Sequence, residues 1–122
     1  MRVLLIDDNE ELREFLALCL TEDSMEVVSV GTPADAIASA EREKFDAYVV
    51  DSILGQHDGL SLVGELKGTK NGKSVPVMLM SSISTALARR VAQSSGCDEF
   101  MVKPFGQLQF IEQVKGLQKI RR

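Results

Sequence analysis

The sequence contains few cysteines, no long apolar run and no excess of positive charge. Only two of its 122 residues are cysteine. Cys19 and Cys97 do not have the spacing of a metal site, and we expect both to be reduced thiols, with Cys19 buried on the apolar side of a helix. A disulfide framework is therefore not expected.

Long hydrophobic runs are also missing. No apolar stretch approaches the roughly 18–20 residues that would span a bilayer. The apolar segment at the start runs only from Val3 to Ile6, and Asp7 and Asp8 follow it at once, which a signal peptide would not show. We therefore expect a cytoplasmic protein that does not bind membranes.

Negative charge exceeds positive charge. The 14 Lys and Arg against 18 Asp and Glu give a formal net charge of −4, so nucleic-acid binding by this chain alone is not expected. A hydrophobic content of 44% with 26% charged residues is typical of a soluble globular protein. We expect residues 1–122 to form one domain with a substantial core.

Short apolar runs alternate with amphipathic segments along the chain. The runs are typical of buried strands, and the segments after them carry the apolar spacing or the capping residues of helices. This alternation favours an α/β fold, a parallel sheet covered by helices on both faces. Strands are expected at residues 2–6, 26–30, 47–50, 75–80 and 99–102, and helices at residues 12–20, 33–44, 60–67, 84–95 and 108–117.

Several residues mark the ends of these helices. Either Asp8 or Asn9 suits the cap of the first helix. Thr32 followed by Pro33 opens the second, and Gly96 fits the end of the fourth. That fourth helix is weak, because its larger apolar residues are few.

Some polar residues are interpreted as surface. Lys67, Lys70 and Lys73 flank or lie in a polar turn and are expected to be solvated. His57, the only histidine, also falls in a turn, and we interpret it as neither a ligand nor a phosphoryl donor.

Reactive side chains follow four of the expected strands. Asp7 and Asp8 follow the first, Asp51 ends the third, Ser81 the fourth and Lys103 the fifth. Parallel strands all point the same way, so these residues should meet at one edge of the sheet. A single Asp beside a turn is explained as well by turn formation, but the joint placement favours a site.

Such a cluster has a specific chemistry. Carboxylates at one edge repel each other and raise the pKa of at least one of them, unless a divalent cation binds; an all-oxygen cluster suits Mg²⁺. A carboxylate can also accept a phosphoryl group as a nucleophile. Lys103 could neutralise the charge of that group and Ser81 could donate a hydrogen bond to it.

These residues, with the stretch DSILGQHDGL from Asp51 and the Lys103-Pro104-Phe105 segment, resemble a response-regulator receiver domain. Receivers are the phosphoacceptor modules of two-component signalling, and the resemblance, to the chemotaxis-regulator type, covers essentially the whole chain. It implies a flavodoxin-like doubly wound sheet of five parallel strands in the order 2-1-3-4-5, with five helices.

The resemblance also implies roles for the site residues. Asp51 is the phosphoacceptor. Asp8 and Asp51 bind Mg²⁺ directly, Asp7 binds mainly through water, and the backbone carbonyl of Ile53 completes the protein's share. Lys103 pairs with the phosphoryl group.

Further roles follow from the same resemblance. Ser81 hydrogen-bonds the phosphoryl group, and Phe100 is the switch aromatic, with plain core packing as the alternative. The peptide between Lys103 and Pro104 is expected to be cis. Gly55 stands where proline is common, which predicts a looser loop.

Two isoleucines stand at positions where polar side chains could orient a water molecule. By resemblance, Ile53 and Ile83 flank the mouth of the site. Neither can hold a water in line for hydrolysis, so the phosphorylated state is expected to be long-lived.

We therefore expect a phosphorylation-controlled signalling switch that catalyses its own phosphotransfer and dephosphorylation, rather than a conventional enzyme. The donor would be a histidine kinase or a histidine phosphotransfer protein. A downstream effector would bind the face formed by residues 84–122. The chain is expected to be a monomer or a weak dimer.

Three alternatives remain from the residues themselves. An aspartyl-phosphate phosphohydrolase commonly has a second Asp two residues after its nucleophile, where Asn9 follows Asp7. A flavodoxin-like cofactor binder would carry a phosphate-binding loop after Ile6, which is absent. A phosphorylation-independent pseudo-receiver is disfavoured because all the required groups are present.

Overall fold

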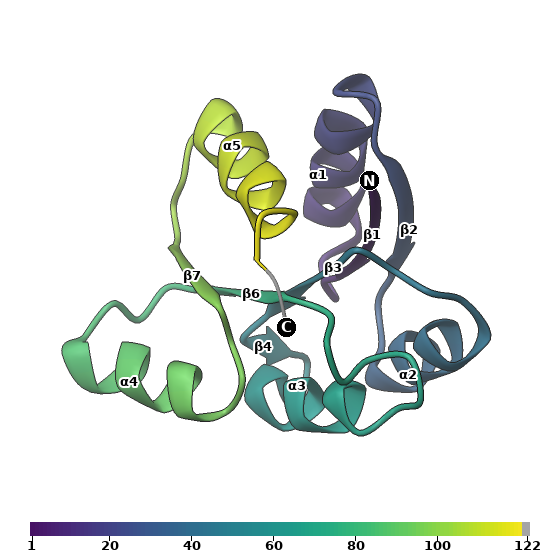
Figure 1. Cartoon of the computed structure of the whole chain (residues 1–122). Helices are drawn as coiled ribbons and strands as arrows, with labels where there is room; N and C mark the ends of the chain where they lie inside the picture. Colours follow the sequence, from purple (N-terminus) through teal and green to yellow (C-terminus); the bar gives the residue numbers. More distant parts are fainter. Residues whose placement is uncertain (121–122) are drawn as a thin grey trace.

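A five-stranded parallel sheet in the order β2-β1-β3-β6-β7 forms the centre of the molecule (Figure 1). The computed structural model describes residues 1–120. Counting only these five strands, the order is the predicted 2-1-3-4-5. Their bounds are β1 (Arg2–Ile6), β2 (Glu26–Val30), β3 (Ala47–Asp51), β6 (Val77–Ser81) and β7 (Glu99–Val102).

Helices cover both faces of this sheet. Figure 1 shows α1 and α5 on one side, and α2, α3 and α4 on the other. None of the helices within residues 1–120 has the length and hydrophobicity needed to cross a bilayer. Their bounds are α1 (Glu10–Glu22), α2 (Pro33–Arg42), α3 (Gly59–Lys67), α4 (Ala86–Ser94) and α5 (Gln107–Leu117).

The core consists of two apolar layers separated by the sheet. All residues of β3 and β6 are buried, as expected for central strands of a sheet covered on both faces. Alternate residues of each strand enter opposite layers: Tyr48 and Val50 pack toward α2 and α3, whereas Ala47 and Val49 pack toward α1 and α5. Apolar packing on both faces thus supports the sheet up to the edge where the polar residues lie.

Helix ends follow the predicted capping residues. Asn9, not Asp8, caps α1: its side chain accepts a hydrogen bond from the Leu12 N–H at 3.0 Å. Thr32 caps α2 with Pro33 at the first position. Gly96 follows the end of α4 with φ +104°, a conformation that side chains disfavour.

The fourth main strand differs at both ends from the predicted residues 75–80. Pro76 has no N–H to donate to the sheet, and the N–H of Val75 is used by the preceding turn, where it bonds the Gly72 carbonyl at 3.2 Å. The strand therefore starts at Val77. It continues to Ser81, which pairs with Val102 of β7.

The loop predicted after Asp51 contains a short hairpin. β4 (Ile53–Leu54) and β5 (His57–Asp58) pair antiparallel. Gly55 turns the chain with φ +63°. Proline cannot adopt this angle, so glycine here is required by the turn.

Surface predictions are confirmed with one exception. His57, Lys70 and Lys73 are exposed, and Cys19 and Cys97 are buried free thiols. The prediction for Lys67 is wrong: it is half-buried, and its ammonium group donates to the Val75 carbonyl at 2.6 Å. The contact between Lys67 and Val75 depends on how the turn between them folds back, which the sequence alone does not show.

Helix α4 is the least anchored of the five helices. Ala92 is its single buried residue, whereas α1 buries Leu16, Cys19 and Leu20. Leu87 and Val91, its larger apolar residues, remain exposed. The weak helix predicted at residues 84–95 is therefore present as a shorter element with little core contact.

Candidate functional site

Three carboxylates meet at the carboxyl edge of the sheet. The parallel register pairs Ile6 of β1 with Val50 of β3, so the residues after them are neighbours. One oxygen from each of Asp7, Asp8 and Asp51 lies within 4.8 Å of the others. Asp7 is fully buried and Asp51 is 5% exposed, whereas Asp8 is open to solvent.

Asp7 is the most constrained of the three. Its Oδ1 accepts a hydrogen bond from the Asn9 N–H at 3.0 Å, while its Oδ2 is buried without a hydrogen-bond partner among residues 1–120. Burial, and next the charge of Asp51, raise the pKa of Asp7 to about 6, although the Asn9 N–H and Lys103 oppose this. A buried oxygen of this kind is costly unless a proton or a cation reaches it.

Asp51 is held from two sides. Its Oδ1 accepts the Ile53 N–H at 3.2 Å, and its Oδ2 lies 2.8 Å from the Lys103 ammonium group. Lys103 follows β7, where its own N–H bonds the Ser81 carbonyl at 2.8 Å. The peptide between Lys103 and Pro104 is cis, as predicted.

Ser81 ends the strand beside Asp51. The register pairs Asp51 with Met80, so Ser81 lies one residue further along the same edge. It is 5% exposed, and its Oγ accepts the Ile83 N–H at 3.1 Å. The hydroxyl proton remains for a second acceptor.

Phe100 and the two isoleucines surround this edge. Ile53 is 60% and Ile83 57% exposed. Phe100 is half-buried and packs against the core layer of α2 and α3, and the Arg89 guanidinium lies 5.0 Å from its ring centroid. The ring thus contacts both the core and the Arg89 cation.

Gly59 is a site residue that the sequence did not identify. A Cβ atom at this position would collide with the Asp51 carbonyl oxygen and come within 2.8 Å of the Ser52 Cα. The Asp58 side chain caps α3 through the Leu60 N–H at 3.1 Å. The Asp58-Gly59 pair in the sequence indicates a turn, but it does not show that the start of α3 approaches the backbone of Asp51.

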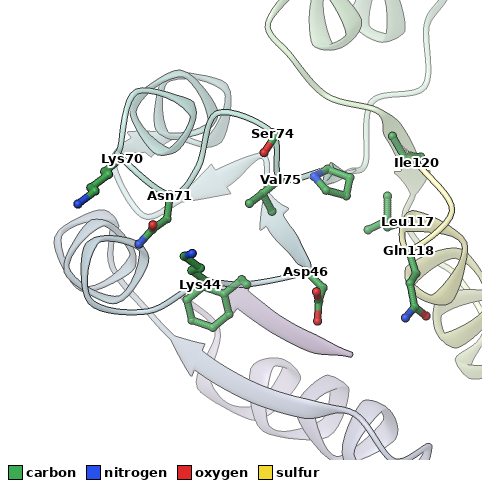
Figure 2. Close-up of a pocket in the computed structure, with 11 residues that line it drawn as sticks. Lys44, Asp46, Lys70, Asn71, Ser74, Val75, Leu117, Gln118 and Ile120 are labelled. Carbon is green, nitrogen blue, oxygen red and sulfur yellow. The ribbon is translucent and has the colours of Figure 1, made fainter. Parts of the chain in front are cut away.

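Two cavities lie near opposite edges of the sheet. One, of about 410 Å³, adjoins Ser81 and is enclosed by α4, β6 and β4. The other, of about 550 Å³, lies at the amino edge among the loops before β3 and β6 and the end of α5. In Figure 2 Lys44 and Asn71 line one side of it, with Asp46 and Gln118 on the other. The larger cavity contains none of the clustered carboxylates.

The carboxylate cluster fits a divalent cation with oxygen ligands. It offers oxygens only, as Mg²⁺ prefers. The partnerless Oδ2 of Asp7 shows that the protein itself does not satisfy the cluster. The ion pair of Lys103 with Asp51 adds a cation on the other side.

Comparison with known proteins points to one family. The chain matches the response regulator receiver domain model over residues 3–115. It is 32% identical over 120 residues to the transcriptional regulatory protein PrrA of Mycobacterium tuberculosis, covering 98% of this chain and 51% of that protein. It is 27% identical to the transcriptional regulatory protein GltR of Pseudomonas aeruginosa, covering 94% and 48%. The chain therefore spans about half the length of the relatives it matches.

Solved structures agree with this match. The chemotaxis protein CheY4 of Vibrio cholerae has a TM-score of 0.90 at 20% identity, with 95% and 97% of the two chains covered, a likeness of fold. The receiver domain of sensor histidine kinase PA1611 from Pseudomonas aeruginosa has a TM-score of 0.82 at 27% identity, covering 97% and 94%. That structure has a magnesium ion coordinated in its active site cleft. With its fold, its edge carboxylates and these matches, the chain belongs to the response regulator receiver domain family of two-component signalling.

Proposed function

We propose that this receiver, as one domain over residues 1–122, accepts a phosphoryl group on Asp51 in a Mg²⁺-dependent reaction. The observation that carries the proposal is the setting of Asp51: a nearly buried carboxylate with the Lys103 ammonium group at 2.8 Å and two further carboxylates beside it. A turn-forming Asp would need neither the lysine nor the cluster.

The reaction is a transfer between two nucleophiles. The donor is a phosphohistidine of a histidine kinase or a histidine phosphotransfer protein. A carboxylate oxygen of Asp51 attacks phosphorus, an O–P bond forms, and the P–N bond breaks with its electron pair left on the imidazole nitrogen. Lys103 neutralises charge on the transferring oxygens, and the Ser81 hydroxyl donates a hydrogen bond to one of them.

When bound, Mg²⁺ supplies positive charge that offsets the negative charge of the carboxylates and the phosphoryl oxygens. Asp8 and Asp51 would hold it directly, Asp7 mainly through water, and the Ile53 carbonyl would complete the set. The clustered oxygens and the partnerless Oδ2 of Asp7 support this assignment. So does the magnesium ion in the PA1611 receiver domain.

The signal would leave through α4, β7 and α5. Movement of Ser81 toward the phosphoryl group pulls on the loop before α4. Because Ala92 is the single buried residue of α4, this helix shifts at low cost. Phe100 then changes rotamer, and a downstream effector reads the face formed by residues 84–122. Residues 121–122 of that face lie outside the described residues. Since histidine kinases phosphorylate from the cytoplasm, we place the domain there.

Phosphorylation by a small acyl phosphate or amidophosphate donor tests the proposal. With Mg²⁺, intact-mass spectrometry should show one added phosphoryl group on the wild type and none on Asp51→Asn. Asp58→Asn is the matched control, because Asp58 is an exposed carboxylate in the same segment and Asn preserves its helix cap. Full labelling of Asp51→Asn would overturn the assignment.

A further inference from the structure

Six of the seven exposed large hydrophobic side chains within residues 1–120 gather in two patches. The first lies on α1, where Phe15 is 50% and Leu18 55% exposed. Glu11, Phe15, Leu18 and Glu22 follow each other at helical spacing and are all exposed, so they form one stripe on the solvent side of α1. We call this stripe the α1 patch. It is an acidic amphipathic surface with nothing packed on it.

The second patch is a hollow beside α4. Ile53, Ile83, Leu87 and Val91 are each at least 44% exposed, and all four line the cavity of about 410 Å³. We call this cavity and its rim the α4 groove. Contiguous exposed apolar side chains of this kind mark binding surfaces, and the groove is wide enough to receive aromatic and aliphatic side chains.

The two patches have opposite charge. Helix α4 is the only one of the five helices without an acidic residue, and it carries Arg89 and Arg90. Arg90 follows Leu87 by one helical turn and directly precedes Val91, two residues that line the groove. Helix α1 has four glutamates against one arginine. The carboxylate that lines the groove, Asp58, is engaged in capping α3. The patch and the groove are therefore both apolar, and they lie on helices of opposite charge.

One molecule cannot join its own two patches. Helix α1 lies on one face of the sheet and α4 on the other (Figure 1). We propose that the α1 patch of one copy of this chain docks into the α4 groove of a second copy, so that the chain associates head to tail. The proposal is argued from exposed surfaces of the free protein, so it stands independently of the proposed function.

A head-to-tail contact has a consequence that a two-fold dimer lacks. Each bound copy keeps one unused patch or groove, so the assembly grows with concentration unless it closes into a ring. The predicted monomer or weak dimer would then be the species present at low concentration, and larger assemblies would form as the concentration rises. Because the contact pairs opposite charges, added salt should weaken it.

Sedimentation velocity over a range of concentrations tests the proposal. The weight-average mass of the wild type should rise above the monomer's 13.4 kDa and beyond a dimer, and high salt should lower it. Phe15→Ser in the patch and Leu87→Ser in the groove should each weaken association about tenfold or more, as truncation of an interface anchor does.

Mixing the two variants gives the decisive result. Phe15→Ser keeps an intact groove and Leu87→Ser keeps an intact patch, so an equimolar mixture should form a one-to-one complex that grows no further. Glu11→Lys and Arg90→Glu form a second pair: each alone should weaken association, and their mixture should recover it. Circular dichroism shows whether each variant is folded.

Leu108→Ser is the matched control, because Leu108 is the seventh exposed hydrophobic residue, 72% exposed and outside both patches. It should leave association unchanged. A wild type that stays monomeric at high concentration overturns the proposal. So does loss of association in Leu108→Ser, or a mixture of Phe15→Ser and Leu87→Ser that forms no complex; the latter would indicate a two-fold contact or a different partner for these surfaces.

Discussion

At the amino edge of the sheet, Arg2 bonds Glu26 at 2.6 Å and Glu43 at 2.8 Å. Its guanidinium also lies over the Phe45 ring, and its backbone N–H bonds Asp46 beside the cavity of Figure 2. Each carboxylate there has a cationic or N–H partner. These contacts need no other molecule, so the amino edge is complete in the free protein.

At the carboxyl edge the balance is reversed. Lys103 pairs with Asp51, but Asp7 and Asp8 add negative charge beside it, and one oxygen of Asp7 is buried without a partner among residues 1–120. Such an arrangement is unfavourable in the free protein and favourable once a cation binds. The comparison teaches that this fold satisfies its charges at the amino edge and leaves them unsatisfied at the edge where we propose that a cation binds.

The largest expected effect is on the free energy of unfolding, and it comes from protonation of Asp7. Its raised pKa, about 6 against an ordinary 3.8, means that the folded protein binds this proton more tightly than the unfolded chain does. The contribution to stability is therefore fully present below pH 4 and is lost as pH rises to about 6, by up to about 3 kcal/mol.

Urea unfolding of wild type and Asp7→Asn in EDTA between pH 4 and 7 measures this contribution. As pH rises from 4 to 7, the free energy of unfolding of the wild type should fall relative to that of Asp7→Asn. Mg²⁺ should offset the loss at pH 7. Two parallel curves would show that Asp7 carries no such cost.

Removing a carboxylate should weaken Mg²⁺ binding only if that carboxylate belongs to the carboxyl edge. Asp8→Ala should lower the affinity at least about tenfold, equivalent to about 1.4 kcal/mol, by calorimetric titration. Lys103→Ala should retain Mg²⁺ binding while phosphorylation becomes much slower. Asp46→Ala, a carboxylate of the amino edge, is the control and should bind as the wild type does. Loss of binding in Lys103→Ala with binding intact in Asp8→Ala would reverse the assigned roles.

The exposed isoleucines should set the lifetime of the phosphorylated state. Ile53→Asn with Ile83→Glu gives polar groups that can orient a hydrolytic water, so dephosphorylation should be about tenfold faster, a barrier change of about 1.4 kcal/mol. Mg²⁺ binding should not weaken, because Ile53 would contribute only its carbonyl. Radiolabelled phosphoprotein is followed after donor removal, with Leu108→Asn as the control. Equal or slower decay in the double variant would contradict the prediction.

The smallest effect should come from the paired charges of the amino edge. The hydrogen bond that the Arg2 guanidinium donates to Glu43 is the main cause that raises the pKa of Arg2, but these groups are partly exposed and screened by solvent. Arg2→Met, which keeps the apolar stem over Phe45, should shift the urea midpoint slightly, and high salt should remove the difference. A large salt-independent loss would show that this edge too depends on its charges.

Most of the fold could be predicted from the sequence. The strands at residues 2–6, 26–30 and 99–102 lie where the sequence predicted them, although only β1 is largely buried and β2 and β7 form the edges of the sheet. The edge that gathers Asp7, Asp8 and Asp51 followed from strand direction alone. Where several polar residues end parallel strands, topology brings them together without further information.

Other features depend on contacts between distant segments. The hairpin after Asp51 has only two residues in each strand, too few for a periodic pattern. The start of β6 depends on which N–H groups the preceding turn uses, and the bond from Lys67 to Val75 depends on how that turn folds back. The matching patches on α1 and α4 could not be predicted either, because their exposure depends on which helix faces the core leaves open.

The fit of Gly59 against Asp51 bears on which substitutions the domain can accumulate. Any side chain at Gly59 would press on the backbone of Asp51, the proposed phosphoacceptor, so we expect a change there to disturb the site directly. Gly64 and Gly116 lie in helices with open space around them, and alanine at either should favour the helix by about 1 kcal/mol. Three glycines of one chain therefore tolerate substitution very differently, because the space around each position decides whether a side chain fits.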